Sequence, residues 1–174
     1  MVAVAIGRDE GRITKEEQAS GEIFLVKSRS TEDALQLVEP YASPDATLIS
    51  ITRMFPEKTS PSSSFGSVEH YWLTNLVGDR RIPPGALSRL ISIVKAQLDS
   101  RRRTVVFLEG VEYLILENDF GTVLKVLNQL CDLAISSSSM VFISVDPLAL
   151  SQKDVAMIER TCGALVLGAD YEVF

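Results

Sequence analysis

The 174-residue chain lacks most of the residues on which catalytic and metal sites are commonly built. His70 is its only histidine, Cys131 and Cys162 are its only cysteines, and no glycine is followed by lysine. Because the cysteines are far apart and show no CxxC spacing, neither a zinc site nor a redox pair is expected, and this usage fits a reducing cytoplasm. No GxSxG motif accompanies the histidine, so no nucleophilic triad is expected. These absences favour a non-catalytic role that needs no cofactor and no metal.

Positive charge and long hydrophobic runs are also scarce. The 17 Lys and Arg residues are outnumbered by 23 Asp and Glu residues, which gives a net charge of −6 and an isoelectric point near 4.9. Such a chain has no overall positive field to attract nucleic acid or an anionic membrane, so neither partner is expected. The arginines at 80–81 and 101–103 are expected at solvated helix ends, with docking of an anion as the alternative. No apolar run is long enough to cross a bilayer or to form a signal-peptide core, which indicates a cytoplasmic protein.

The chain is long enough for one domain with a substantial core. Residues 2–6 form a short apolar run, but residues 7–20 are polar and contain little to bury. We therefore expect a tail over residues 1–20, with an edge strand and a connector as the alternative. Residues 21–174 are expected to form a single α/β domain.

Short apolar segments alternate with amphipathic helical patterns after residue 20, an order typical of βαβ units. Helix starts are predicted at Ser30, Pro83, Asn118 and Ser151, and each of the two serines has an aspartate three residues later. The pattern predicts a three-layer α/β sandwich with a mainly parallel sheet, helices on both faces and a C-terminal β-hairpin. The predicted strands span residues 22–27, 46–52, 71–74, 104–108, 140–145, 163–167 and 171–174.

Three charged residues each come directly after a predicted strand: Arg53, Glu109 and Asp146. The carboxyl ends of parallel strands meet at one edge of a sheet, and open α/β sheets bind their ligands there. These residues are therefore the candidate functional rim. Arg53 is expected to pair with Glu109 or Asp146. The alternative is that the three residues form an ion-pair cluster with a purely structural role.

The segment between the strands at 46–52 and 71–74 is long, rich in serine and proline, and bordered by aromatic residues. Loops of this length are commonly functional. We therefore expect a partner-contact loop, whose candidate residues are Phe55, Phe65, His70 and Trp72. The alternatives are that Trp72 belongs to the core and that His70 is a packing or surface residue.

Glu109 also raises the question of nucleotide binding, because a carboxylate at this position holds magnesium or polarises a water in P-loop NTPases. The motif GxxxxGK[ST] is absent, however, and the prolines of the loop after Arg53 remove amides that a phosphate cradle needs. A nucleotide-binding protein or weak ATPase with a non-standard site is therefore the alternative function. It would use Glu109 with Arg53 or Lys58, and it would need free amides at a helix N-terminus beside Glu109. Glu109 with Glu112 or Asp119 could bind a cation, although the spacing does not require it.

Several segments in combination resemble one known family, namely EIFLVKSRSTEDALQLV, LISITRMFP, YWLT, VVFLEGVEYLILENDF and MVFISVDPLAL. They resemble the archaeal family of domains of unknown function numbered 835, over about residues 21–162. The resemblance implies a degenerate relative of the RecA/KaiC core without a Walker A loop, with a sensor-like strand that ends at Ser144 and Asp146. Members of the family stand alone or at the end of archaeal sensory proteins, which implies signal transduction but no particular activity. They usually have an aspartate where this chain has Glu109.

The favoured function is therefore a non-catalytic protein-interaction or signal-output domain. Its partner is expected to be another protein, with self-association as a further alternative. Arg53, Glu109 and Asp146 would hold the shape of the rim, and the partner-contact loop would touch the partner.

Overall fold

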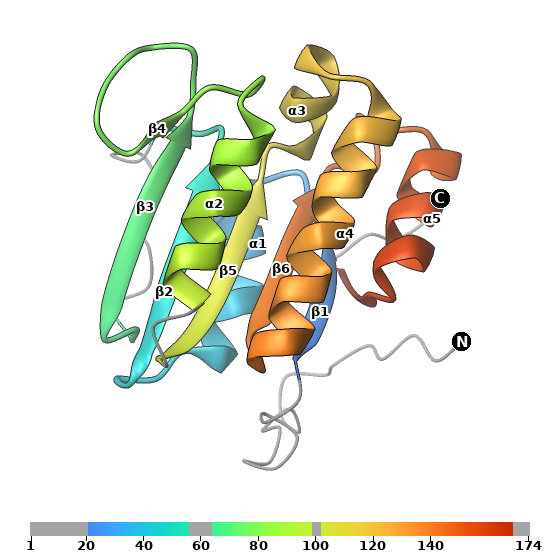
Figure 1. The fold of residues 1–174 in the computed structure, drawn as a ribbon. Helices are drawn as coiled ribbons and strands as arrows, with labels where there is room; N and C mark the ends of the chain where they lie inside the picture. The colour runs from blue at the N-terminus through green and yellow to red at the C-terminus, as the bar shows by residue number, and fades with distance from the viewer. Residues whose placement is uncertain (1–20, 56–63, 99–101, 169–174) are drawn as a thin grey trace.

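A computed structural model describes residues 21–55, 64–98 and 102–168 of the chain. These residues build one seven-stranded sheet in which every strand is parallel to its neighbours, in the order β4-β3-β2-β5-β6-β1-β7 (Figure 1). The strands are β1 (Glu22–Lys27), β2 (Ala46–Thr52), β3 (Ser67–Leu73), β4 (Arg81–Ile82), β5 (Arg103–Glu109), β6 (Met140–Val145) and β7 (Leu165–Gly168).

Helices cover both faces of the sheet, which confirms the predicted three-layer α/β architecture. The three long helices α2, α4 and α5 lie over one face of the sheet (Figure 1). Helix α1 and the following 3-10 turn η2 lie over the other face, and the short helix α3 follows the end of β5. Their bounds are α1 (Thr31–Val38), η2 (Glu39–Tyr41), α2 (Leu87–Leu98), α3 (Val111–Glu117), α4 (Phe120–Ser137) and α5 (Gln152–Cys162).

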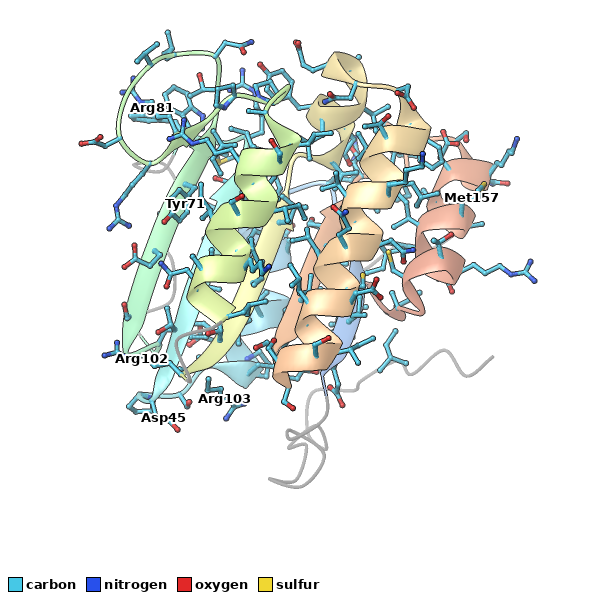
Figure 2. The ribbon with its side chains drawn as sticks, in the orientation of Figure 1. Asp45, Tyr71, Arg81, Arg102, Arg103 and Met157 are labelled. Atoms are coloured by element: carbon cyan, nitrogen blue, oxygen red, sulfur yellow. The ribbon has the colours of Figure 1, made fainter. Side chains whose placement is uncertain are left out.

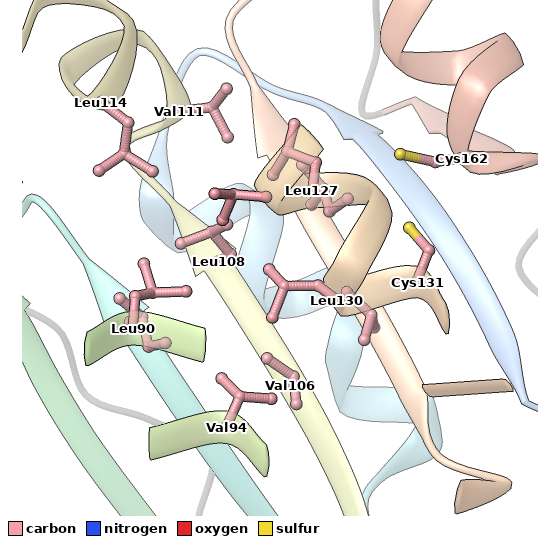
Figure 3. Packing of buried hydrophobic residues seen from close by; sticks show 14 of the residues in the cluster. Leu90, Val94, Val106, Leu108, Val111, Leu114, Leu127, Leu130, Cys131 and Cys162 are labelled. Atoms are coloured by element: carbon pink, nitrogen blue, oxygen red, sulfur yellow. The ribbon is translucent and has the colours of Figure 1, made fainter. Parts of the chain in front are cut away.

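The side chains of the central strands alternate between two buried clusters. On β5, Val106 and Leu108 pack with residues of α2 and α4, whereas Val105 and Phe107 pack with residues of α1. Figure 3 shows Val106 and Leu108 within the larger cluster. Burial on both faces explains why the strands have nearly continuous apolar sequences instead of alternating polar and apolar residues.

The two predicted serine caps are confirmed. Ser30 Oγ accepts a hydrogen bond from the Asp33 amide at 3.2 Å, and Ser151 Oγ accepts one from the Asp154 amide at 3.0 Å. Each bond satisfies an amide that the first turn of a helix cannot satisfy internally. The strands predicted at 22–27, 46–52 and 140–145 are confirmed with the same boundaries.

Two predicted helix starts are wrong. Pro83 and Pro84 do not open α2, because a turn precedes the helix in which the Ala86 amide donates to the Pro83 carbonyl at 2.9 Å. Asn118 ends α3, and the cap of α4 is Asp119, whose side chain accepts from the Thr122 amide. The short helix α3 displaced the second start by one position, whereas the turn after Pro83 displaced the start of α2 to Leu87.

Other boundaries also differ from the predictions. β3 begins at Ser67, and the unpredicted β4 contains Arg81, so this arginine lies in a strand rather than at a helix end. Arg103 likewise begins β5, and it lies at the opposite end of the molecule from Arg81 (Figure 2). β7 pairs in parallel with β1. The predicted strand at 171–174 and the N-terminal tail lie outside the described residues.

The two cysteines meet between helices, which their sequence separation did not predict. Cys131 of α4 and Cys162 of α5 are both buried, and their sulfur atoms face each other (Figure 3). A hydrogen bond to Cys162 and burial raise the pKa of the Cys131 thiol, so this thiol stays protonated. The contact arises because α4 and α5 pack side by side, and it serves the core as a pair of small apolar groups.

Candidate functional site

The carboxyl ends of the parallel strands meet at one edge of the sheet, here called the carboxyl-end rim. It consists of residues 28–31, 53–55, 74–77, 109–117 and 144–149, which follow or end β1, β2, β3, β5 and β6. All five segments lie at the same end of the molecule, near the top in Figure 1. The rim contains Arg53, Glu109 and Asp146, as the sequence predicts.

Glu109 joins the exit of β2 to the end of β5. Its Oε2 atom accepts hydrogen bonds from the backbone amides of Arg53 at 2.9 Å and Met54 at 3.4 Å. Gly110 permits this close approach, since it has a φ of 102° and a Cβ at this position would lie 2.9 Å from the Arg53 Cβ. Burial raises the pKa of Glu109, while the two amide bonds and the Arg53 charge oppose the rise.

The Arg53 side chain is not the ion-pair partner that the sequence suggested. Within the described residues it forms no salt bridge with Glu109 or Asp146. Its guanidinium instead lies 4.4 Å from the centre of the Tyr113 ring, and Nη1 donates to the Leu73 carbonyl at 3.3 Å. Arg53 therefore meets Glu109 through its backbone, and its charge remains at the exposed surface.

Glu112 and Asp146 form a second link between a carboxylate and the backbone. Glu112 Oε1 accepts from the Asp146 amide at 2.5 Å, and Asp146 Oδ1 accepts from the Leu148 amide at 2.9 Å. Burial raises the pKa of Glu112, and the negative charges of Glu109 and Asp146 add to the rise. The three carboxylates thus fix the loops of the rim by accepting backbone amides rather than by pairing with arginine.

A cavity of about 250 Å³ lies at the rim between the amino end of α1 and the ends of β5 and β6. Residues 28–31, Glu109, Glu112, Ser144, Asp146 and Ala149 line it. The sequence did not identify residues 28–31 as part of the site. They reach it because β1 lies next to β6 in the sheet, although the two strands are far apart in the sequence. The available signal was Ser30, a helix cap placed directly after a strand.

The predicted partner-contact residues divide into separate environments. Phe55 and Trp72 pack edge to face with ring centres 4.9 Å apart, and Trp72 Nε1 donates to the Arg53 carbonyl at 3.0 Å. His70 is half-buried with Nε2 3.1 Å from Thr52 Oγ1, and burial lowers its pKa. Phe65 is only 7% exposed and packs in the core cluster under α1, so it is not available to a partner.

Exposed large hydrophobic side chains concentrate at the rim. They include Val77 at 96% exposure, Leu116 at 83% and Leu148 at 70%. We call the full set the apolar rim residues, and it comprises Met54, Phe55, Leu76, Val77, Leu116 and Leu148. Elsewhere in the described part, Ile135, Met157 and Leu165 are also exposed, but they lie on α4, α5 and β7.

Among the described residues, no helix is long and apolar enough to cross a membrane. In the part of the chain that the structure describes, no three side chains of His, Cys, Asp or Glu lie close enough together to hold a metal ion.

The fold and the site together define an open parallel α/β domain with an acidic cavity at the carboxyl ends of its strands. A family model described as protein of unknown function (DUF835) matches residues 27–162, which include the whole cavity and all apolar rim residues. The chain therefore belongs to this family. A search of curated proteins finds no match to it. The likeness to RecA/KaiC proteins and the archaeal origin stay predictions.

Removal of the Glu109 carboxylate should destabilise the domain. In Glu109→Ala the amides of Arg53 and Met54 lose their acceptor, which should lower the free energy of unfolding by about 1–3 kcal/mol. Glu109→Gln keeps a carbonyl acceptor and should cost clearly less. Urea unfolding followed by circular dichroism measures both, with Glu117→Ala on the exposed end of α3 as the control. Equal stability of Glu109→Ala and wild type would show that the bond contributes nothing.

The raised pKa values of Glu109 and Glu112 predict a pH dependence of stability. Above pH 4.5, the usual pKa of glutamate, the unfolded chain releases protons that the folded state still holds on Glu109 and Glu112. The free energy of unfolding should therefore fall as the pH rises from 4.5 through the raised pKa values of the folded state. The double variant Glu109→Gln with Glu112→Gln lacks both groups. Its free energy of unfolding relative to wild type should therefore improve as the pH rises from about 4.5 towards neutral. A pH-independent difference between the two proteins would contradict the shifts.

Proposed function

We propose that this chain is a non-catalytic protein-interaction domain that binds its partner through the apolar rim residues. The observation that carries the proposal is their distribution, because they come from four separate segments that meet at one end of the sheet. Single exposed hydrophobic residues are common on protein surfaces, whereas their concentration on one face is typical of an interaction site. A signal-output role in the cytoplasm would use the same surface.

The support beneath these residues favours an interface that is formed before binding. Phe55 packs against Trp72, and the Arg81 guanidinium lies 5.5 Å from the centre of the Trp72 ring. The indole in turn is fixed by its hydrogen bond to the Arg53 carbonyl. Tryptophan and arginine are frequent among the residues that dominate binding energy at interfaces. Because these side chains already have partners, binding would cost little additional ordering.

Nucleotide binding remains the second candidate because the amino end of α1 and Glu109 border the same cavity. Two observations weaken it. The amides of Ser30 and Asp33 are engaged by the hydroxyls of Ser28 and Ser30, and Glu32 and Asp33 already compensate the positive end of the helix dipole. The cavity also carries more acidic than basic residues, which disfavours phosphate.

Replacement of two apolar rim residues should remove partner binding without unfolding the domain. Leu76→Ser with Val77→Ser removes exposed apolar surface, so stability should change by no more than about 0.5 kcal/mol. Binding should weaken by about tenfold or more if these residues lie at the centre of the interface. The measurement is quantitative mass spectrometry of proteins that co-purify from host lysate, together with light scattering for self-association.

Ile135→Ser provides the matched control, because Ile135 is equally apolar and 58% exposed but lies at the far end of α4. Proteins that interact specifically should be lost from the rim variant and retained by the control. Equal recovery with both variants would contradict a contact surface at the rim.

Thermal unfolding with ATP or GTP and magnesium tests the second candidate. The protein-interaction proposal predicts no change in melting temperature at millimolar nucleotide. A ligand at one hundred times its dissociation constant would stabilise the folded state by about 2.7 kcal/mol, which is easily detected. A shift that disappears in Glu109→Gln would assign nucleotide binding to the cavity and overturn the ranking.

A further inference from the structure

The cavity beside α1 has an excess of negative charge. Glu109, Glu112 and Asp146 line it, and Arg29 is the one basic residue among the described residues of its wall. The charges of Glu109 and Asp146 repel the ionised form of Glu112. A cation in the cavity would relieve this repulsion, whereas an anion would increase it.

Ser144 gives an independent indication of a polar ligand. It is only 3% exposed, it lines the cavity, and its hydroxyl makes no hydrogen bond to any residue that the structure describes. β6 pairs Ser144 with Glu109 of β5, so the two side chains leave the sheet on the same side. The Ser144 hydroxyl borders the cavity without a donor from a described residue, so its oxygen is suited to accept a hydrogen bond from a donor inside the cavity.

The carboxylates are held in position but not saturated. Backbone amides bond to one oxygen of each, namely Glu109 Oε2, Glu112 Oε1 and Asp146 Oδ1. No hydrogen bond from another described residue reaches the second oxygen of Glu109 or Asp146. A positively charged donor would find acceptors that are already fixed, and charge-assisted bonds of this kind are strong.

The arrangement of these acceptors suits an organic cation better than a metal ion. They are distributed around a cavity of about 250 Å³, and in the part of the chain that is described no three of them converge at metal-binding distances. Guanidinium and ammonium groups carry several N–H donors that point in different directions, so they can reach acceptors on separate walls.

We propose that this cavity binds an alkylguanidinium or alkylammonium group. Glu112 and Asp146 supply the opposing charge, Glu109 adds a third acceptor, and Ser144 accepts a hydrogen bond from the ligand. The site does not include the apolar rim residues, so this proposal does not depend on the proposed protein interaction. The cation can come from a free amine or from a basic side chain of a polypeptide.

Amide chemical shifts of the ¹⁵N-labelled wild-type protein test the proposal without any substitution. The probe is n-butylguanidinium, a ligand small enough that a dissociation constant on the order of 1 mM is expected. Its addition should shift the amides of residues 28–31, Glu112 and Asp146 selectively. Tetramethylammonium has the same charge without N–H donors, and inorganic phosphate has the opposite charge, so neither should shift these amides to a similar extent.

Variants then locate the site. Asp146→Asn and Glu112→Gln each remove a charge and should weaken butylguanidinium binding by about tenfold or more. Ser144→Ala should weaken it to a smaller extent. Asp132→Asn removes an exposed charge on α4 and should leave binding unchanged. The spectrum of each variant without ligand shows directly whether it is folded.

Three results would overturn the proposal: no selective shifts at about fifty times the expected dissociation constant, equal shifts with tetramethylammonium, or stronger shifts with phosphate or magnesium. A comparison with N-acetylargininamide identifies the source of the cation. Binding as tight as that of butylguanidinium assigns the cavity to a basic side chain of a polypeptide, and binding of butylguanidinium alone assigns it to a free amine or guanidine.

Discussion

The hydrogen bonds from the Arg53 and Met54 amides to the Glu109 carboxylate determine the shape of the carboxyl-end rim. β2 and β5 are neighbours in the sheet, and this contact continues their connection beyond the last bonded residues of the two strands. With the Arg53 backbone fixed, its carbonyl can accept the Trp72 indole, against which Phe55 packs. One partly buried carboxylate therefore organises the segment after β2 and its contact with the end of β3.

Glu112 repeats the same device on the other side of the rim, where it accepts the Asp146 amide. Carboxylates in these positions stay partly buried because backbone donors replace some of the water that they lose. The remaining cost appears as the raised pKa values of Glu109 and Glu112. The rim thus combines rigid loops with concentrated negative charge at the cavity and exposed apolar side chains around it. This division separates the two proposals, since the apolar rim residues suit a protein surface and the cavity suits a cation.

The sequence predicted the parts of the fold that depend on local pattern. Buried strands such as Met140–Val145 were found with correct limits because both faces are covered, and Ser30 was recognised because a helix cap needs only its own first turn. The edge strand Arg81–Ile82 was missed, since two residues paired only to β3 have no periodicity of their own.

For the site, the sequence identified Glu109 and Asp146 from their positions after strands. It did not identify Ser28 or Ser144 as neighbours of Glu109. Ser144 lies beside Glu109 because β6 pairs with β5, and Ser28 joins the same cavity because β1 lies beside β6. It also assigned the wrong chemistry to Arg53, whose backbone rather than side chain meets the carboxylate. Strand order and side-chain direction are tertiary properties, and neither is encoded in the spacing of residues along one strand.

Amide hydrogen exchange in the native protein tests most directly whether carboxylates hold the rim. The amides of Arg53 and Asp146 lie outside regular strands and helices, so only their bonds to Glu109 and Glu112 should slow their exchange. We expect both to exchange much more slowly than the amide of Val77, whose residue is 96% exposed on the neighbouring loop. Exchange of all three at the same fast rate would contradict the central role of these carboxylates.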